Sequence, residues 1–181
     1  MQWHKNCISL GLASGFLEPL ESTSLHLIQS GIIRLAKLFP ATTDYASQRD
    51  LYNRQSATEF EQIRDFIILH YKVSQRTDSD FWNYCRHMPV PESLQKKLDL
   101  YESSGRLFRD NNELFDEVSW FAVMQGQGLR PRHYHPLANQ VEANEFHRIM
   151  QEIKAVVQRA ADAMPTHAEY IAAHCAASKN H

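Results

Sequence analysis

Apolar residues recur every three or four positions along most of this chain, which is the spacing of one face of an α-helix. The first such run begins near Ser22 and Thr23 and stops at Pro40, because proline cannot continue a helix. Its apolar positions are Leu25, Ile28, Ile32, Leu35 and Phe39. The pattern therefore predicts a helix that begins directly after a segment of serine and threonine.

The same spacing predicts helices over most of the remaining chain. They run from Thr58 to about Tyr71, from Asp78 or Ser79 through Cys85 to Pro89 and Pro91, from Ser93 through about Tyr101 to Gly105, from Asn112 to Met124, and from Asn139 to His174 with a break at Pro165. One face of the first is formed by Phe60, Ile63, Ile67 and His70/Tyr71, and the buried side of the last is expected to hold Phe146, Ile149, Ile153 and Val156/Val157. The fold class is therefore expected to be mainly α.

Strand signals are scarce. The segment "NCISLGL", residues 6–12, reads as one short buried strand that leads into a glycine-containing loop. One strand cannot close a sheet, so it is expected to join a sheet made by another chain or by an N-terminal region. The chain is accordingly interpreted as a truncated part of a larger protein.

Composition and charge exclude several classes of function. The 181 residues are 43% hydrophobic and 10% aromatic, which is enough for the core of one domain. A formal net charge of −2 gives no basic excess for nucleic acid or an anionic membrane. The longest apolar run is far short of the ~20 residues of a membrane span, and no signal peptide opens the chain. Cys7, Cys85 and Cys175 are widely spaced, so neither a disulfide framework nor a CxxC metal site is expected. These features favour a soluble cytoplasmic protein.

An unusual density of polar groups precedes the first helix, in "GLASGFLEPLESTSLHLI", residues 11–28. A loop of small residues leads into it and contains Gly11, Ala13, Ser14 and Gly15. Such a loop lets a flat ligand approach the backbone, and the N–H groups of a helix N-terminus attract an anion. The alternative is that Ser22 or Thr23 merely caps the helix while Glu18 and Glu21 complement its dipole. The residue types alone leave both interpretations open.

Two histidine pairs could suit a metal ion, but loop packing is the favoured interpretation. His133 and His135 have His-x-His spacing without an acidic or cysteine partner nearby, and His167 and His174 lie near Cys175. No metal site is expected. The aromatic residues Tyr101, Phe115, Trp82 and Trp120 are interpreted as core in preference to pocket residues.

The segment 11–28 resembles the signature of the flavin-dependent halogenases, the tryptophan halogenase family. The similarity continues through "RDFIILHYKVSQRTDSDFWNYCRHMPVPESL" (64–94), "SGRLFRDNNELFDEVSW" (104–120) and "GQGLRPRHYHPL" (126–137), and it covers essentially the whole chain. The resemblance implies the helical C-terminal part of a flavoprotein-monooxygenase-like (α+β) fold. The GxGxxG and WxWxIP motifs of the family's N-terminal FAD module are not in these 181 residues.

The resemblance also implies roles for individual residues. Glu21 falls at the position of the family's active-site glutamate, and the backbone N–H groups of Thr23 and Ser24 at its halide-binding positions. The residues expected to border the isoalloxazine ring of FAD are Gly11, Ala13, Ser14, Gly15 and Ser22. Residues 1–40 would complete the flavin and halide site, and residues 41–181 would form the helical substrate-binding and C-terminal region. No lysine here matches the family's essential lysine.

Two departures bear on the substrate. This chain has Ser24 where the well-studied tryptophan enzymes have glycine after "EST", and Leu114-Phe115 where they carry a Phe-Trp pair. Phe115 and Trp120 are the resulting candidates for substrate contact. Indole-like or other electron-rich arenes, free or tethered, are therefore considered alongside tryptophan.

The sequence thus predicts the C-terminal portion of an FAD-dependent halogenase. By resemblance, it would chlorinate or brominate an electron-rich arene through hypohalous acid made from reduced flavin, O2 and halide. It would be inactive alone and would need a flavin reductase and an N-terminal FAD domain, or it would self-associate. The alternatives are a non-catalytic helical remnant or interaction module, and a flavin-dependent aromatic monooxygenase.

Overall fold

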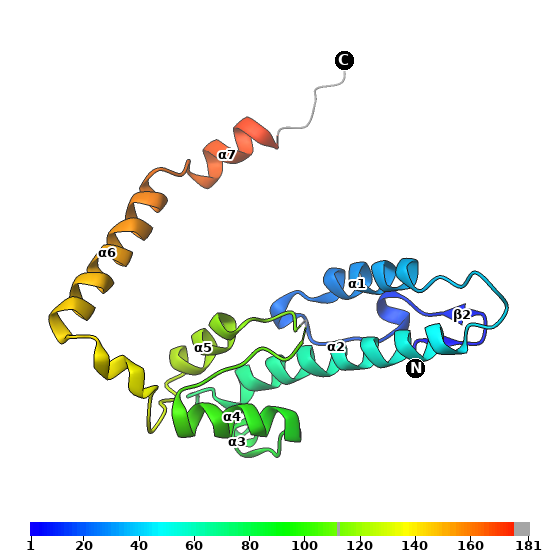
Figure 1. The fold of residues 1–181 in the computed structure, drawn as a ribbon, viewed down its shortest axis with the longest axis horizontal. Coiled ribbons are helices and arrows are strands. Elements are labelled where there is room, and N and C mark those ends of the chain that lie inside the picture. The colour runs from blue at the N-terminus through cyan, green and yellow to red at the C-terminus, as the bar shows by residue number, and fades with distance from the viewer. Residues whose placement is uncertain (112, 176–181) are drawn as a thin grey trace. The chain divides into compact units, whose positions relative to one another are not determined.

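The computed structural model describes residues 1–111 and 113–175, in two compact units, Met1–His135 and Pro136–His181. In the first unit the long helix α2, Ala46–Lys72, is the central element. Helix α1, Ser24–Lys37, packs along it, and α3 (Asp80–His87), α4 (Glu92–Ser104) and α5 (Glu117–Gly126) contact it as well (Figure 1). The expected mainly helical fold is confirmed.

A small hairpin occupies the N-terminus. Strand β1, Trp3–His4, pairs antiparallel with β2, Cys7–Ile8, and Lys5 in the turn between them has a φ of 50°. The strand expected over 6–12 is therefore much shorter, because Gly11–Ala13 turns into the 3-10 helix η1. The expectation that it needs a sheet from elsewhere is wrong for these strands, since the chain supplies the partner itself.

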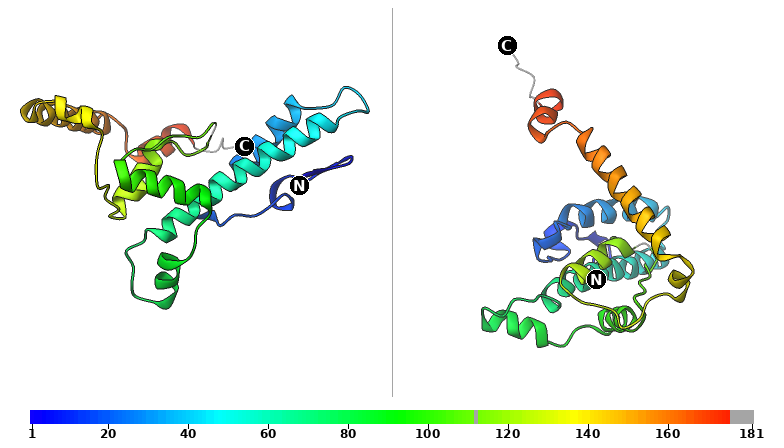
Figure 2. Two further views of the ribbon diagram at one scale, coloured as in Figure 1. Left: turned by 60° about the horizontal axis from the view of Figure 1, so that its bottom comes forward. Right: turned by 90° about the vertical axis from the view of Figure 1, so that its left-hand side faces the viewer.

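The hairpin is attached to the N-terminal half of α2 (Figure 2). The Asn53 side chain accepts hydrogen bonds from the backbone N–H groups of Gln2 and Trp3, at 2.9 and 2.8 Å, and donates one to the Trp3 carbonyl at 2.9 Å. The Trp3 ring is 3% exposed and packs on Tyr45 and Tyr52. The Asn53 side chain thus bonds backbone groups of Gln2 and Trp3 that a further strand would otherwise pair with.

The core lies at the other end of α2. Its buried members come from α2 and the residue that follows it, from α4 and from α5, and are Phe66, Leu69, Val73, Leu94, Leu98, Tyr101, Trp120 and Met124. Helix α2 begins at Ala46, well before the expected Thr58, because residues 46–57 are mostly polar and show no continuous apolar face. Helix α5 begins at Glu117, where the Asp116 side chain caps it; Asn112, its expected start, lies outside the described residues.

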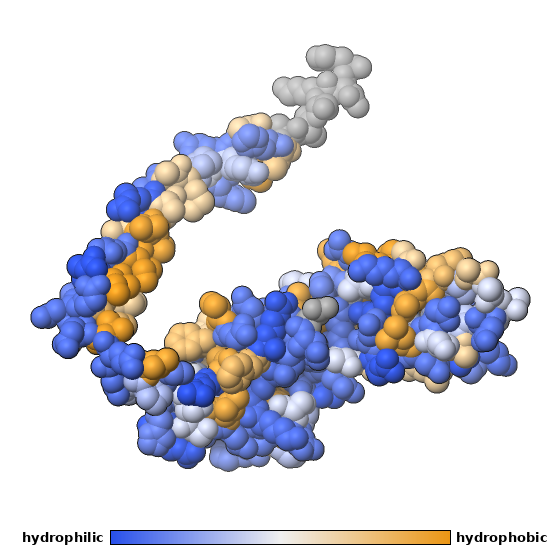
Figure 3. Space-filling model, viewed as in Figure 1, coloured by the Kyte–Doolittle hydropathy of each residue, from blue (hydrophilic) through white to orange (hydrophobic). Residues whose placement is uncertain are grey.

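The second unit holds the 3-10 helix η3, Pro136–Gln140, and the helices α6, Ala143–Asp162, and α7, His167–His174. The break expected at Pro165 is confirmed, and Thr166 and Glu169 form a capping box that begins α7. The expected burial of the apolar side of α6 is wrong for this unit taken by itself: Phe146 and Val157 are 57% and 63% exposed. Figure 3 shows this apolar stripe along α6.

Helices in the described ranges are too short or too polar to cross a membrane. The functional boundary expected at residue 40 is not a boundary between the compact units, because α1 packs on α2. It remains a prediction.

Candidate functional site

The turn before α1 is built from a short 3-10 helix, η2, Pro19–Glu21, followed by two residues of contrasting backbone conformation. Proline at the start of η2 is pre-organised for a helical φ. Ser22 then adopts a left-handed conformation with φ 53°, and its N–H donates to the Pro19 carbonyl at 2.9 Å. Thr23 returns to a helical conformation and α1 begins at Ser24. The segment from Glu21 to Ser24 is therefore one tight turn.

Both glutamates of this turn are held by consecutive residues of α2. Oε1 of Glu21 lies 2.8 Å from Nε2 of His70, with the two side chains 31% and 18% exposed. The hydroxyl of Tyr71 donates to Oε2 of Glu18 at 2.6 Å. The two carboxylates thus join this turn to the last turn of α2.

The capping role considered for Ser22 and Thr23 is absent, because neither side chain makes a capping hydrogen bond to α1. Thr23 is 4% exposed. Among the described residues, no acceptor bonds the backbone N–H groups of Thr23 or Ser24. Unbonded N–H groups at the start of a helix are suited to an anion.

The small-residue loop has structural reasons for its glycines. Gly15 has a φ of +155°, and a Cβ there would lie 2.8 Å from Cε1 of Phe60 on α2. Gly11 has a φ of +63°, and the Ser14 hydroxyl donates to its carbonyl at 2.7 Å. Ala13 and Gly15 are exposed, so part of the loop backbone remains open to a flat ligand such as a flavin ring.

A series of aromatic rings connects the site to the core. The Phe66 ring meets His70 edge-on at 4.9 Å and stacks on Phe115 at 3.9 Å between centroids. Trp120 meets the same Phe66 ring at 5.0 Å. Trp120 is 2% exposed, so core packing accounts for it, whereas Phe115 is only partly buried. The rings therefore fix the position of the histidine that contacts Glu21.

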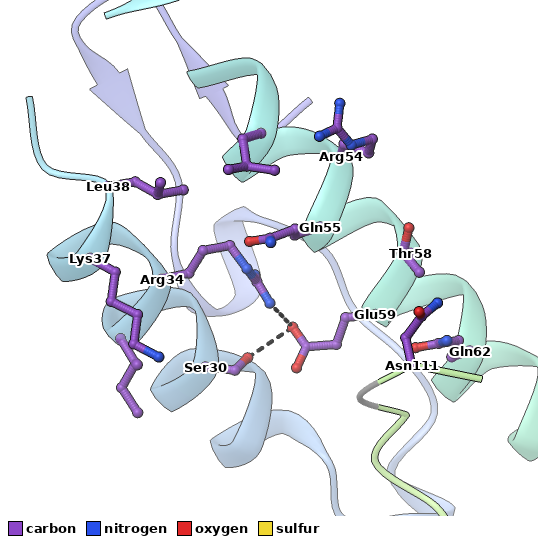
Figure 4. Close-up of a pocket in the computed structure, with 12 residues that line it drawn as sticks. Ser30, Arg34, Lys37, Leu38, Arg54, Gln55, Thr58, Glu59, Gln62 and Asn111 are labelled. Atoms are coloured by element: carbon purple, nitrogen blue, oxygen red, sulfur yellow. Dashed lines mark hydrogen bonds and ion pairs between the residues drawn. The ribbon is translucent and has the colours of Figure 1, made fainter. Parts of the chain in front are cut away.

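A pocket of about 700 Å³ lies between α1 and α2 and is lined by none of the expected site residues (Figure 4). Glu59 at its centre accepts hydrogen bonds from Ser30 at 2.9 Å and from Arg34 at 2.8 Å. Arg34 also donates to Ser56 at 2.7 Å. These bonds join the two helices, so the pocket is a polar gap in their packing.

Metal ligands do not gather in the described part of the chain. No group of three or more histidine, cysteine or acidic side chains is found there at metal-binding distance. His174 instead packs against Tyr170, with ring centroids 4.6 Å apart.

Comparison with known proteins gives the family of this chain. The family model described as tryptophan halogenase matches residues 1–143. The chain belongs to the tryptophan halogenase family. It is 30% identical over 179 residues to a 7-chloro-L-tryptophan 6-halogenase of Kutzneria sp. (strain 744), covering 94% of this chain and 34% of that protein.

Solved structures of flavin-dependent halogenases are also similar to this chain. A flavin-dependent halogenase from Xanthomonas campestris superposes with a TM-score of 0.94 at 47% identity, covering 97% of this chain and 36% of the other. A second, from Brevundimonas sp. BAL3, gives 0.91 at 45% identity, covering 95% of this chain and 35% of the other. The chain thus spans about a third of the length of the relatives it matches.

The role of Glu21 stays a prediction, and no pattern in the sequence singles out His70 as its contact. The apolar spacing places His70 on one helix face with Phe60, Ile63 and Ile67. Glu21 lies on another element, 49 residues away, and the spacing of apolar residues does not relate the two. Polarity was the available signal, because a histidine at the end of an apolar face needs a partner for each ring nitrogen.

Proposed function

We propose that this chain forms part of an FAD-dependent halogenase that chlorinates or brominates an electron-rich, tryptophan- or indole-like arene. The observation that carries the proposal is the turn at Glu21, where a carboxylate held by His70 stands two and three residues before the unbonded N–H groups of Thr23 and Ser24. The family membership and the halogenase activities of the relatives support the same chemistry.

In this proposal the cofactor is reduced FAD, which with O2 and halide supplies hypohalous acid. The exposed loop backbone around Ala13 and Gly15, with Gly11, Ser14 and Ser22, would border the flavin ring. The residues present fit such a ring, because the loop is small and part of it is open.

The remaining site residues bind the halide, take part in the acid–base chemistry and contact the arene. The N–H groups of Thr23 and Ser24 hold the halide ion at the positive end of α1. The Glu21 carboxylate hydrogen-bonds hypohalous acid and accepts the proton that the arene loses after halogenation. Phe115 is a candidate for contact with the arene, and Trp120 packs against the same Phe66 ring on which Phe115 stacks.

The complete enzyme would further require a flavin reductase and the FAD-binding segment that relatives three times this length provide. The cytoplasmic location expected from the sequence remains a prediction.

The proposal is tested in a chimera in which this chain replaces the corresponding segment of the Xanthomonas campestris halogenase. With reduced flavin, O2 and halide, the chimera is expected to halogenate indole-like arenes. Glu21→Gln should leave flavin binding and folding intact and lower product formation by ~10²-fold or more, the scale of a positioned acid–base group.

Glu18→Gln is the matched control, because Glu18 lies in the same turn and contacts Tyr71 in place of His70. It should retain most of the product formation. Equal, small losses in both variants would contradict the assignment of Glu21. A product formed equally well without halide would instead identify an aromatic monooxygenase.

A further inference from the structure

The hydrogen bonds of His70 define where its protons lie. Nδ1 is 2.8 Å from the carbonyl oxygen of Phe66, and because a carbonyl only accepts, Nδ1 carries a hydrogen. Nε2 is 2.8 Å from Oε1 of Glu21. A single proton therefore lies between Nε2 and Oε1, whether it belongs to an imidazolium beside a carboxylate or to a carboxylic acid beside a neutral ring.

The histidine ring has little freedom to move. Its Nδ1 is bonded within α2, one helical turn from Phe66, and its edge-on contact with the Phe66 ring places it against the core. Phe66 is 2% exposed and is packed between Phe115 and Trp120. The Glu21 carboxylate is therefore bonded to a ring whose position is fixed by the buried Phe66.

The second oxygen of the carboxylate is left for other work. No residue in the described ranges bonds Oε2 of Glu21, and the side chain is 31% exposed. One oxygen of Glu21 is thus committed to His70, and the other is available.

We propose that His70 is the positioning residue of Glu21: its Nε2 holds Oε1 so that Oε2 is the oxygen that takes the arene's proton. This inference rests on the proposed function. In that step the C–H bond of the halogenated, cationic ring breaks, its electron pair restores the aromatic ring, and the proton passes to Oε2. The step requires the carboxylate form of Glu21, so the proton between Nε2 and Oε1 belongs to Nε2 throughout, and His70 keeps it while Oε2 becomes protonated.

Two substitutions separate positioning from packing. His70→Phe keeps an aromatic ring against Phe66 and removes the Nε2 donor, whereas His70→Gln loses the ring and restores an N–H near the position of Nε2. If His70 positions Glu21, His70→Phe in the chimera lowers kcat ~10-fold or more with little change in KM, and His70→Gln recovers most of the loss. If the ring only packs, His70→Phe keeps full activity and His70→Gln is the impaired variant, which would overturn the inference.

A second readout needs no catalysis. In the 181-residue chain, ¹⁵N NMR of the histidine rings is expected to show a protonated Nδ1 in His70 and an Nε2 signal that shifts in Glu21→Gln but not in Glu18→Gln. An Nε2 signal indifferent to Glu21→Gln would disprove the contact, even if the His70 variants failed to fold.

The proposed function and the positioning role of His70 are contradicted by different results. Full activity of the Glu21→Gln chimera would contradict the proposed function, while the NMR contact could still be present. Loss of activity in Glu21→Gln together with full activity in His70→Phe would contradict only the positioning role.

Discussion

Tyr71 illustrates how a single hydrogen bond in the turn changes a side chain's chemistry. The pKa of Tyr71 is raised from 10.0 to about 12, mainly by its hydrogen bond to Glu18 and secondly by burial. Because the pKa in the folded protein is the higher one, the bond stabilises the fold fully below about pH 10. That contribution is lost as the pH rises from about 10 through 12.

We therefore expect ultraviolet titration of the tyrosines to show one group that ionises near pH 12 by this bond, and Glu18→Gln to move it toward pH 10. Glu21→Gln is the control, because Glu21 contacts His70 and not Tyr71. A titration curve unchanged by Glu18→Gln would show that the bond is not formed.

The sequence predicts which site residues lie together when they are neighbours in the chain, but not which side chains of other elements contact them. Glu21, Thr23 and Ser24 lie in one quoted motif, and the turn does place them together. The contacts of Glu18 and Glu21 come from α2, and only the packing of α1 and α2 brings these residues within reach. A pattern of apolar spacing carries no information about such a pairing.

Among the elements, the hairpin on α2 offers the clearest test. Asn53 makes three hydrogen bonds to the backbone of Gln2 and Trp3. Asn53→Ala leaves these groups to water or unpaired, so the free energy of unfolding should fall by about 1–3 kcal/mol, measured by urea denaturation. Gln55→Ala, on an exposed position of the same helix, should change it by less than about 0.5 kcal/mol. Equal effects of the two substitutions would mean that the hairpin is held by Trp3 alone.

The sequence predicts helix ends correctly where a glycine or a proline ends the helix. Gly105 ends α4 in a left-handed conformation with φ 67°, and Pro165 separates α6 from α7. The strand was misjudged because the hairpin turn at Lys5 lacks the usual glycine or asparagine at that position, and the polar first half of α2 lacks a periodic face. Both features depend on contacts with other elements.

For the whole molecule, the prediction concerns the 181-residue chain by itself. It should give no halogenated product with reduced flavin, O2 and chloride, because it carries no GxGxxG cradle for the FAD pyrophosphate. Product formation measured by chromatography with the isolated chain would contradict this.

The isolated chain should also self-associate. Leu25 on α1 is 79% exposed and Leu12 in the loop 76%, and α6 adds its own apolar stripe (Figure 3). Exposed apolar patches of this kind are covered by a partner in most proteins. Sedimentation velocity is expected to show species larger than a monomer, and a monodisperse monomer would count against an unmet interface.

Helix α2 also sets the distance between the hairpin and the turn at Glu21. It carries Asn53, which fixes the hairpin, and His70, which fixes Glu21, on one continuous rod, about 25 Å apart at 1.5 Å per residue. Inserting or deleting one residue between them would turn one attachment about 100° relative to the other and shift it along the axis. These two attachments therefore fix the number of residues between Asn53 and His70, whereas an exposed side chain such as Gln55 takes part in neither attachment.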